Sequence, residues 1–455
     1  METLSQLLSA MRANGVTRIL AKKLAPNDNS KNQIYLGGDF SALSLLPHGE
    51  VEVDSSELAG SVRDRAKASM DFYWMEGGCV YQAPAAQLIL YPRFPEVRLS
   101  GLLKGCAAAP SSVLRVRDEG RVLILGATPD GRVISFAAGA DHPIGREIAS
   151  LQDPERVGVF LVLQMSDSTV GDTRHQLIAE LRRVHEMGWI GSRRLDSAGA
   201  SIPYVARNGG GLTLEAELGI RPNGRAEPDY LGWEVKQYGV SSLFMMRALS
   251  LITLMTPEPS AGLYADEGAE SFIRKFGYAD RGGRSDRMNF GGDYRVGRGP
   301  HPLTGLSLVV RGYDPTENRI TDMAGDLALM NTDGIVAAAW PFTTLMAHWT
   351  HKHARAVYVP SVRRPEPPAY AFGNIVSLFA KADFLLFLSA LSLGVVKYDP
   401  ALKIEGSSSG RPRIKKRNQF RTWYTDLSAL YGAGEVVDVV TGAQVDSDRV
   451  LSSPH

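Results

Sequence analysis

The first third of the chain consists of short strand-like runs, and this pattern restricts the possible folds more than any other feature of the sequence. Between Arg18 and Met165, β-branched and aromatic residues come in runs of strand length that Gly, Pro, Asn and Asp interrupt. Several short strands with little helix between them are typical of a compact β-barrel or sandwich. The clearest runs are QIYLGG, QLILYP, EVRLSGLL, RVLILGA, RVISFAA and RVGVFLVLQM.

A part of different character follows a short polar stretch. SDSTVGDT, at 166–173, is made mostly of small and polar residues, which suits a linker. A chain of 455 residues is also too long for one ordinary hydrophobic core. We therefore expect a β-rich domain over residues 1–165, a linker over 166–173 and a second domain over 174–455.

The second part mixes helical and strand patterns without a regular alternation. TRHQLIAELRRVHEMG predicts a helix that ends at Gly188, with Leu177, Leu181 and Val184 along one face. DFLLFLSALSLGVV is too short to span a bilayer and predicts a core helix that ends at Gly394. The expected fold class of this domain is α/β (α+β).

The composition is that of a soluble globular protein, with 44% hydrophobic and 22% charged residues. Because the net charge is only +1, any site for a polyanion must be a local basic patch. The two cysteines, Cys79 and Cys106, fit a reducing compartment and argue against a disulfide scaffold. The N-terminal METLSQLLSAMRANG lacks the long apolar segment of a secretory signal. We expect a cytoplasmic protein that does not contact a membrane.

The stretch EPDYLGWEVKQ, at 227–237, places acids and a lysine beside apolar residues. Apolar residues alternate with polar ones in its second half, which predicts a strand with Glu234 and Lys236 on the same face. The apolar residues of this alternation are Leu231, Trp233 and Val235. Asp229 precedes the strand, immediately after a proline.

A further carboxylate can reach this group from a neighbouring element. GGGLTLEAELGI predicts a short amphipathic helix that carries Glu215. Three carboxylates with one lysine are unfavourable to bury unless a cation neutralises them. Mg²⁺ prefers oxygen ligands of this kind, so the group suits metal-assisted hydrolysis of a phosphodiester. The alternative is a solvated strand face with an ordinary Glu–Lys pair.

The order of these motifs resembles a known family of nucleases. LEAELG, PD and GWEVK follow one another between Leu214 and Lys236, and HWTHKHARAVYVPS comes later, at 348–361. This order resembles the PD-(D/E)xK nucleases and, within them, the MutH-like and MvaI/BcnI restriction endonucleases. The resemblance extends from Thr173 to Gly432 and includes RNQFRTWYTDLSALY near its end.

The resemblance implies a role for each acid and lysine. Asp229 and Glu234 become the ligands of Mg²⁺, and Lys236 the lysine that positions the attacking water. Glu215 supports the metal site from its helix, and Lys352 faces the phosphate. The separation between Asp229 and Glu234 is short for the family. It leaves little room for a long hairpin between the two acids.

The resemblance also implies an activity and its partners. We expect a type II restriction endonuclease that cuts double-stranded DNA to 5′-phosphate ends, at sites like CCWGG or CCSGG, by nicking one strand at a time. It would act as a monomer, beside a cognate DNA methyltransferase. The alternatives are a MutH-like repair nickase and a catalytically inactive DNA-binding regulator.

Two basic segments are candidates for contact with DNA. RPRIKKRNQFR, at 411–421, has no acid, and DRGGRSDRMNFGGDYRVGRG, at 280–299, interleaves arginines with glycines. Phosphate neutralisation requires such clusters, although both could be solubilising loops without a partner. The predicted contacts are Arg284, Arg287, Arg295, Arg298, Lys415, Lys416, Arg417 and Arg421.

The histidines of HWTHKH match no strong zinc pattern, so we interpret them as DNA contacts or ordinary packing rather than metal ligands. His351 and His353 are the predicted contacts.

Basic residues also surround turn-rich segments of the first domain. RILAKKLAPNDNSKNQIYL resembles the arm of the EcoRII-type effector domain, a DNA-binding pseudobarrel, and YPRFPEVRLSGLLKG has a similar character. The resemblance implies that this domain binds DNA. The alternative is a structural β domain with a polar surface. The predicted contacts are Lys22, Lys23, Arg93 and Arg98.

Overall fold

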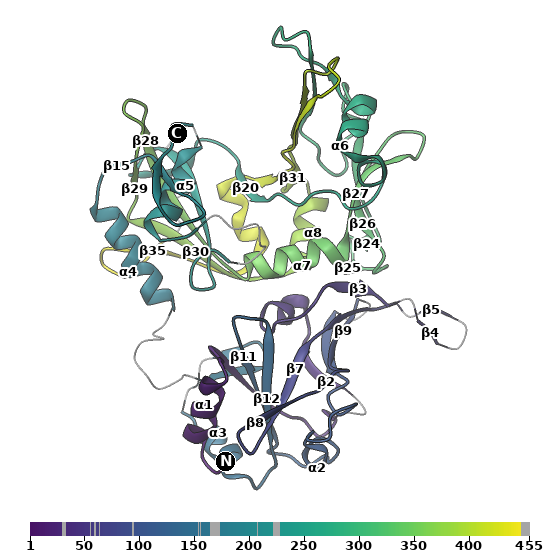
Figure 1. The fold of residues 1–455 in the computed structure, drawn as a ribbon, viewed down its shortest axis with the longest axis vertical. Helices are drawn as coiled ribbons and strands as arrows, with labels where there is room; N and C mark the ends of the chain where they lie inside the picture. Colours follow the sequence, from purple (N-terminus) through teal and green to yellow (C-terminus); the bar gives the residue numbers. More distant parts are fainter. Residues whose placement is uncertain are drawn as a thin grey trace. The chain divides into compact units, whose positions relative to one another are not determined.

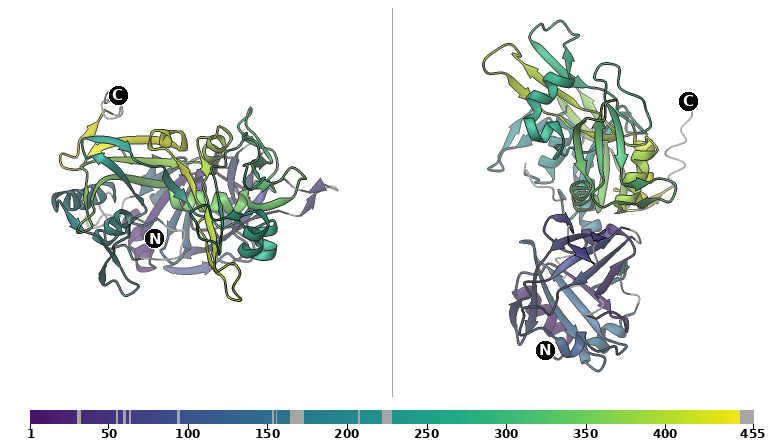
Figure 2. Two further views of the ribbon diagram at one scale, coloured as in Figure 1. Left: turned by 90° about the horizontal axis from the view of Figure 1, so that it is seen from above. Right: turned by 90° about the vertical axis from the view of Figure 1, so that its right-hand side faces the viewer.

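The computed structural model divides the chain into two compact units. Unit 1 comprises Met1–Val170 with Arg319–Met323, and unit 2 comprises Gly171–Asn318 with Ala324–His455 (Figure 1). The structure describes all residues except 30–32, 55, 59–60, 63, 93–94, 153, 155, 164–172, 207, 222–227 and 447–455. Most of the predicted linker therefore lies outside the described residues, and Thr173 already begins a helix. Two further directions of view are given in Figure 2.

Unit 1 is built mainly of two sheets. The larger has the strand order β13-β14-β1-β11-β12-β7-β8, and the smaller has the order β2-β10-β9-β6-β3. The larger sheet contains β1 (Arg18–Lys23), β7 (Asp71–Glu76), β8 (Cys79–Gln82), β11 (Val122–Ala127), β12 (Arg132–Ala138), β13 (Arg156–Val157) and β14 (Phe160–Leu163). The smaller contains β2 (Ile34–Gly37), β3 (Val51–Val53), β6 (Ala66–Ser69), β9 (Gln87–Tyr91) and β10 (Glu96–Ser100). Each of the runs read as a strand in the sequence contains one, and RVGVFLVLQM contains both β13 and β14.

The larger sheet of unit 1 buries one face against two helices that the strand pattern did not predict. These are α1 (Leu4–Ala13), which Thr3 caps by accepting a hydrogen bond from the Gln6 amide, and α3 (Pro143–Ala149). Their buried side chains join those of β1, β11 and β12 in one apolar core. The smaller elements are η1 (Phe40–Ser44), β4 (Glu57–Leu58), β5 (Ser61–Val62) and α2 (Ser111–Leu114).

The main sheet of unit 2 brings distant segments of the chain together. Its order is β15-β29-β28-β30-β35-β36, with β18 and β19 added beside β28. Strand β18 (Glu234–Ser242) runs parallel to β28 (Arg355–Arg364), so that Glu234 pairs with Ala356 and Lys236 pairs with Tyr358. The remaining strands are β15 (Ile190–Gly191), β19 (Met245–Ala248), β29 (Ala369–Phe372), β30 (Ile375–Ala382), β35 (Tyr431–Asp438) and β36 (Gln444–Val445).

Helices α4 (Thr173–Glu186) and α5 (Gly209–Glu217) pack on this sheet. The predicted face of α4 is confirmed, since Leu177, Leu181 and Val184 are all buried. Trp233 and Val235 contribute to the same core. The short strands β16 (Arg193–Leu195) and β17 (Ser201–Pro203) form a hairpin between the two helices.

A second region of unit 2 is made of smaller sheets. Their orders are β20-β34-β31, β21-β22-β32-β33 and β23-β26-β27. The strands are β20 (Ile252–Met255), β21 (Tyr278–Ala279), β22 (Arg287–Gly291), β23 (Ser307–Arg311), β26 (Asp326–Met330), β27 (Val336–Pro341), β31 (Lys397–Tyr398), β32 (Ala401–Glu405), β33 (Arg413–Lys415) and β34 (Phe420–Thr422). Strand β24 (Tyr313–Asp314) also lies in unit 2, whereas β25 (Arg319–Ile320) falls in the Arg319–Met323 segment of unit 1.

The helical elements of this region are α6 (Leu263–Phe276), α7 (Phe342–His353), α8 (Phe384–Ser392) and η2 (Tyr424–Leu430). Helix α8 is the predicted core helix; Asp383 caps it, and Gly394 follows it with a φ of 70°. Among the described helices, none is long and apolar enough to cross a membrane.

Candidate active site

A tight turn at Tyr230–Trp233 determines where Asp229 lies. The amide of each of these two residues donates a hydrogen bond to the carbonyl of the other, at 2.9 and 2.8 Å. Leu231 and Gly232 have φ values of 49° and 79°, and positive values at both central positions are those of a type I′ turn. The chain therefore reverses within two residues, and Asp229 returns alongside the start of β18. Leu231 lies in the turn and is 41% exposed, so its predicted place on the buried strand face is wrong.

The Asp229 carboxylate is fixed against the backbone of β18. Its Oδ2 accepts a hydrogen bond from the Val235 amide at 3.0 Å. The negative charge of Asp229 also helps to raise the pKa of Glu234 and of Glu215, which shows that the three acids share one neighbourhood. The short separation in sequence is thus sufficient, because a two-residue turn replaces a long hairpin.

Glu234 is the most deeply buried of these acids, with 1% of its side chain exposed. Its Oε1 forms ion pairs with the Lys236 ammonium and, at 3.3 Å, with that of Lys352. Its Oε2 is buried and has no hydrogen-bond partner in the described part of the chain. Burial raises the pKa of Glu234 to about 7, even though the two lysines lower it. A buried carboxylate oxygen without a hydrogen-bond partner is unfavourable, and a bound cation would offset this cost.

Lys352 and Glu215 reach this point from two helices. Lys352 lies in the last turn of α7, directly before β28, and 22% of its side chain is exposed. Glu215 lies on α5, and burial together with the Asp229 charge raises its pKa. The fold therefore gathers all five residues that the sequence nominated for catalysis.

The donor set fits a hard divalent cation held by two carboxylates. Asp229 and the free oxygen of Glu234 are oxygen ligands, and such ions complete their coordination with water and phosphate. No group of three or more His, Cys, Asp or Glu side chains within the described ranges is arranged to hold a metal.

A buried hydrogen-bonded chain adjoins the lysines, and sequence reasoning did not find it. The His353 Nε2 lies 3.0 Å from the Leu254 carbonyl, so it must carry the proton. Nδ1 therefore accepts from the Tyr431 hydroxyl at 2.9 Å, and that hydroxyl accepts from Tyr358 at 2.9 Å. Burial holds the pKa of His353 well below its usual value. Tyr358 is the β28 partner of Lys236, so this chain supports the strand beside the site.

Among the histidines of α7, the structure corrects one of the predicted DNA contacts. His353 is fully buried with both ring nitrogens bonded, so it cannot reach DNA from this position. The side chain of His351 lies outside the described residues. His348 lies one helical turn before Lys352, and its pKa is lowered to about 4 by burial and by the charges of Lys352 and Lys236.

The two predicted basic segments become neighbours in the sheet β21-β22-β32-β33. Arg287 of β22 pairs with Glu405 of β32, which in turn pairs with Arg413 of β33. The next row joins Asn289, Lys403 and Lys415, so these side chains share one face. The opposite face carries Phe290, Leu402 and Ile404, all buried. The segments thus form one amphipathic sheet with a largely basic outer face.

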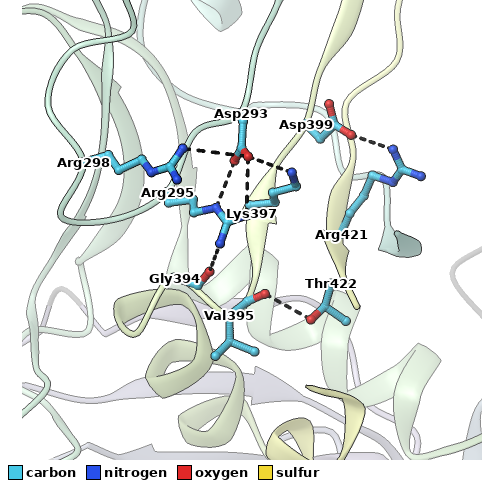
Figure 3. A network of polar contacts seen from close by, with 9 residues as sticks. All are labelled: Asp293, Arg295, Arg298, Gly394, Val395, Lys397, Asp399, Arg421 and Thr422. Carbon is cyan, nitrogen blue, oxygen red and sulfur yellow. Dashed lines mark hydrogen bonds and ion pairs between the residues drawn. The ribbon is translucent and has the colours of Figure 1, made fainter. Parts of the chain in front are cut away.

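Many of these cations already have an acidic partner. Arg287 binds Glu405 at 2.6 Å, and Arg421 binds Asp399 at 2.6 Å. Lys415 and Lys416 make longer ion pairs, 3.2 Å to Glu405 and 3.4 Å to Glu258. Arg284 and Arg417 are exposed. Arg295 and Arg298 converge on Asp293 (Figure 3).

In unit 1, the structure corrects the prediction for Lys22. Its ammonium is buried and bound to Asp28 at 2.6 Å, so it stabilises the interior instead of a DNA surface. Lys23 is exposed. Arg98 pairs with Glu96 at 2.8 Å and lies over the Tyr91 ring, 5.4 Å from its centre. Arg93 lies outside the described residues.

The comparison with family models decides the family. The model of the MvaI/BcnI restriction endonuclease family matches residues 178–431, more than half of the chain. The chain belongs to the MvaI/BcnI family of restriction endonucleases. The matched range includes Glu215, Asp229, Glu234, Lys236 and Lys352. Membership implies a nuclease, and therefore a hydrolase.

Solved structures of restriction endonuclease MvaI are similar to this member of the family. The complex of MvaI with its cognate DNA substrate matches with 18% sequence identity and a TM-score of 0.44. MvaI in the absence of DNA matches with 16% identity and a TM-score of 0.32. Each match covers 60% of this chain and 99% of the MvaI chain. The comparison with curated proteins gave no match.

Proposed function

We propose that this protein is a Mg²⁺-dependent type II site-specific deoxyribonuclease with a PD-(D/E)xK catalytic centre. The observation that carries the proposal is the environment of Glu234. One of its oxygens pairs with two lysines, and the other is buried and has no hydrogen-bond partner among the residues that the structure describes. The charge of Asp229 acts on the same carboxyl. Family membership supports the reaction class.

Asp229 and Glu234 would hold the ion at the start of β18. When bound, Mg²⁺ lowers the pKa of a water molecule and stabilises the charge that develops on the phosphate. The raised pKa of Glu234 means that the carboxyl must release its proton before it can act as a ligand. Glu215 would support this pair from α5.

Lys236 and Lys352 would have two different roles in the reaction. Lys236 is fixed by Glu234 and would orient the attacking water, while Lys352 would bind an oxygen of the scissile phosphate. The water oxygen gives up a proton to the solvent and forms a bond to phosphorus, while the bond from phosphorus to the 3′-oxygen breaks. The 3′-oxygen takes up a proton, which leaves 5′-phosphate and 3′-hydroxyl ends.

The basic face of β21-β22-β32-β33 would bind double-stranded DNA, and MvaI itself is known in complex with its cognate DNA substrate. Exposed residues of this region, Arg284 and Arg417 among them, are free to approach phosphates or base edges. Unit 1 would add a second DNA-binding surface through residues such as Lys23 and Arg98. We further propose a monomer that nicks CCWGG- or CCSGG-like sites one strand at a time, beside a cognate methyltransferase.

The test is incubation of plasmid DNA with the full chain, with Mg²⁺ or with EDTA. We expect discrete fragments with Mg²⁺, and sequencing of their ends gives the site and the cut position. Asp229→Ala should abolish cleavage and leave DNA binding in place, while Asp266→Ala, at an exposed acid of α6, should cleave like the wild type.

Three results would contradict the proposal. Intact plasmid with tight, sequence-specific binding would favour a DNA-binding regulator. Nicked circles that never become linear would favour a repair nickase. Cleavage by Asp229→Ala at the wild-type rate would show that the catalytic centre lies elsewhere.

A further inference from the structure

Asp293 gathers three cations from two segments of unit 2 (Figure 3). Its Oδ2 lies 2.8 Å from the Lys397 ammonium, and its Oδ1 lies 3.1 Å from the Arg295 Nε. The Arg298 Nη1 lies farther away, at 3.9 Å. Burial alone would raise the pKa of Asp293, but Lys397 and Arg295 outweigh it and keep the pKa below its ordinary value, so the carboxylate stays charged.

The cluster has more positive than negative charge. Three cations around one carboxylate leave a net charge of +2. The neighbouring pair of Asp399 and Arg421, at 2.6 Å, is neutral as a unit and does not offset the excess. An excess of this kind favours binding of an anion.

A cavity of about 300 Å³ opens beside the cluster. Its polar lining comes from Asp293, Arg295, Arg298, His301 and Ser307. Burial and the nearby Arg281 lower the pKa of His301, so the imidazole adds no positive charge but can exchange hydrogen bonds. The cavity therefore offers one strongly basic wall.

The two arginines differ in how much of each is already bound. Arg295 makes hydrogen bonds through all three of its nitrogens, two to Asp293 at 3.1 and 3.4 Å and one to the Gly394 carbonyl at 3.2 Å. Lys397 is 12% exposed. Arg298 is 61% exposed, and within the described ranges its one ion pair is the long one to Asp293. Arg298 can therefore turn toward a ligand while the other two stay in place.

We propose that this cluster binds a backbone phosphate of DNA, with Arg298 as the contacting residue and Asp293, Arg295 and Lys397 as its support. The inference rests on the proposed function, since it names one DNA contact of the nuclease. A backbone phosphate suits this cluster as a ligand better than the edge of a base does. Recognition of guanine requires a guanidinium with free nitrogens in a fixed plane, whereas Arg295 has none free and Arg298 is not held in one orientation. A phosphodiester needs only a mobile cation in a positive field.

The experiment measures how DNA binding by the full chain depends on salt. A fluorescent duplex that the wild type cleaves, and a scrambled duplex of equal length, are titrated in EDTA at several KCl concentrations. Each phosphate contact contributes about 0.9 to the slope of log affinity against log salt. Arg298→Gln should reduce the slope by that amount and weaken binding about 8-fold at about 0.1 M salt, equally for both duplexes. The control is Arg183→Gln, at an exposed arginine of α4.

The outcomes separate this inference from the proposed function. An unchanged slope and affinity for Arg298→Gln, in a protein whose wild type still cleaves DNA, would overturn the inference alone. Loss of discrimination between the two duplexes without a change in slope would overturn it in favour of a base contact. Inorganic phosphate distinguishes the remaining source. Inorganic phosphate could stabilise the wild type at constant ionic strength but not Arg298→Gln, while the salt dependence of DNA binding is the same for both proteins. That result would identify a site for free phosphate instead.

Discussion

Replacing Glu234 with glutamine should change how the stability of the metal-free protein depends on pH. The change removes the buried carboxyl and keeps its size. The folded-state pKa of Glu234 is about 7, compared with an ordinary value of 4.5. Between these two values the unfolded chain has already released a proton that the folded protein retains. The contribution of Glu234 to wild-type stability therefore falls as pH rises from about 4.5 to about 7, and then levels off.

The size of this effect follows from the shift. One pKa unit corresponds to about 1.4 kcal/mol, so the shift of Glu234 costs the folded state about 3 kcal/mol once the carboxyl is ionised. Glutamine does not titrate and lacks this cost. Between about pH 5 and pH 8, the free energy of unfolding of Glu234→Gln should therefore rise by about 2 to 3 kcal/mol relative to that of the wild type.

Urea unfolding in EDTA at a series of pH values measures this difference. Tryptophan fluorescence is a suitable probe, because all of the six tryptophans except Trp74 belong to unit 2. Glu180→Gln, at a partly exposed glutamate paired with Arg183, is the matched control and should follow the wild-type curve. If the curves of Glu234→Gln and the wild type run parallel from acid to alkaline pH, burial does not raise the pKa of Glu234, and the reasoning from its environment is refuted.

Three other substitutions test the roles of Lys236 and of the buried tyrosines Tyr431 and Tyr358. Lys236→Met should abolish plasmid cleavage while a gel shift in EDTA still shows binding, because the variant removes the cation held by Glu234 and leaves the basic sheet unchanged; cleavage at the wild-type rate would remove Lys236 from the mechanism. Tyr431→Phe should lower the free energy of unfolding by about 1 to 3 kcal/mol, because it leaves both the His353 acceptor and the Tyr358 donor without a partner. Tyr358→Phe removes only the donor end and should cost less; equal losses in urea unfolding would contradict the assigned direction of the hydrogen bonds.

Elements with a local signal could be predicted from the sequence. The runs of β-branched residues became strands, and helices α4 and α8 ended close to the glycines that marked their ends. Each of these depends on neighbouring residues alone. Glu215, Asp229, Glu234, Lys236 and Lys352 were nominated through the order of their motifs, and the fold brings them together.

What the sequence could not indicate depends on contacts between distant segments. Nothing near His353 shows that it lies between the Leu254 carbonyl and Tyr431, so it looked available to DNA. Lys22 looked like part of a basic arm because its buried partner, Asp28, lies across a turn. The alternation around Leu231 was misleading for a local reason, since a leucine with positive φ is uncommon and only Gly232 hinted at the turn.

The turn at Leu231 and Gly232 has a consequence for how the proposed catalytic centre can vary. Since a two-residue turn brings Asp229 back alongside the start of β18, the spacing of Asp229 and Glu234 is set locally and owes little to the packing of remote elements. One residue more or fewer between them would place the Asp229 side chain on the opposite face of the strand pair. Surrounding loops can lengthen or shorten without moving the two acids, whereas a change in the length of this turn would also have to restore the hydrogen bond from the Val235 amide to Asp229.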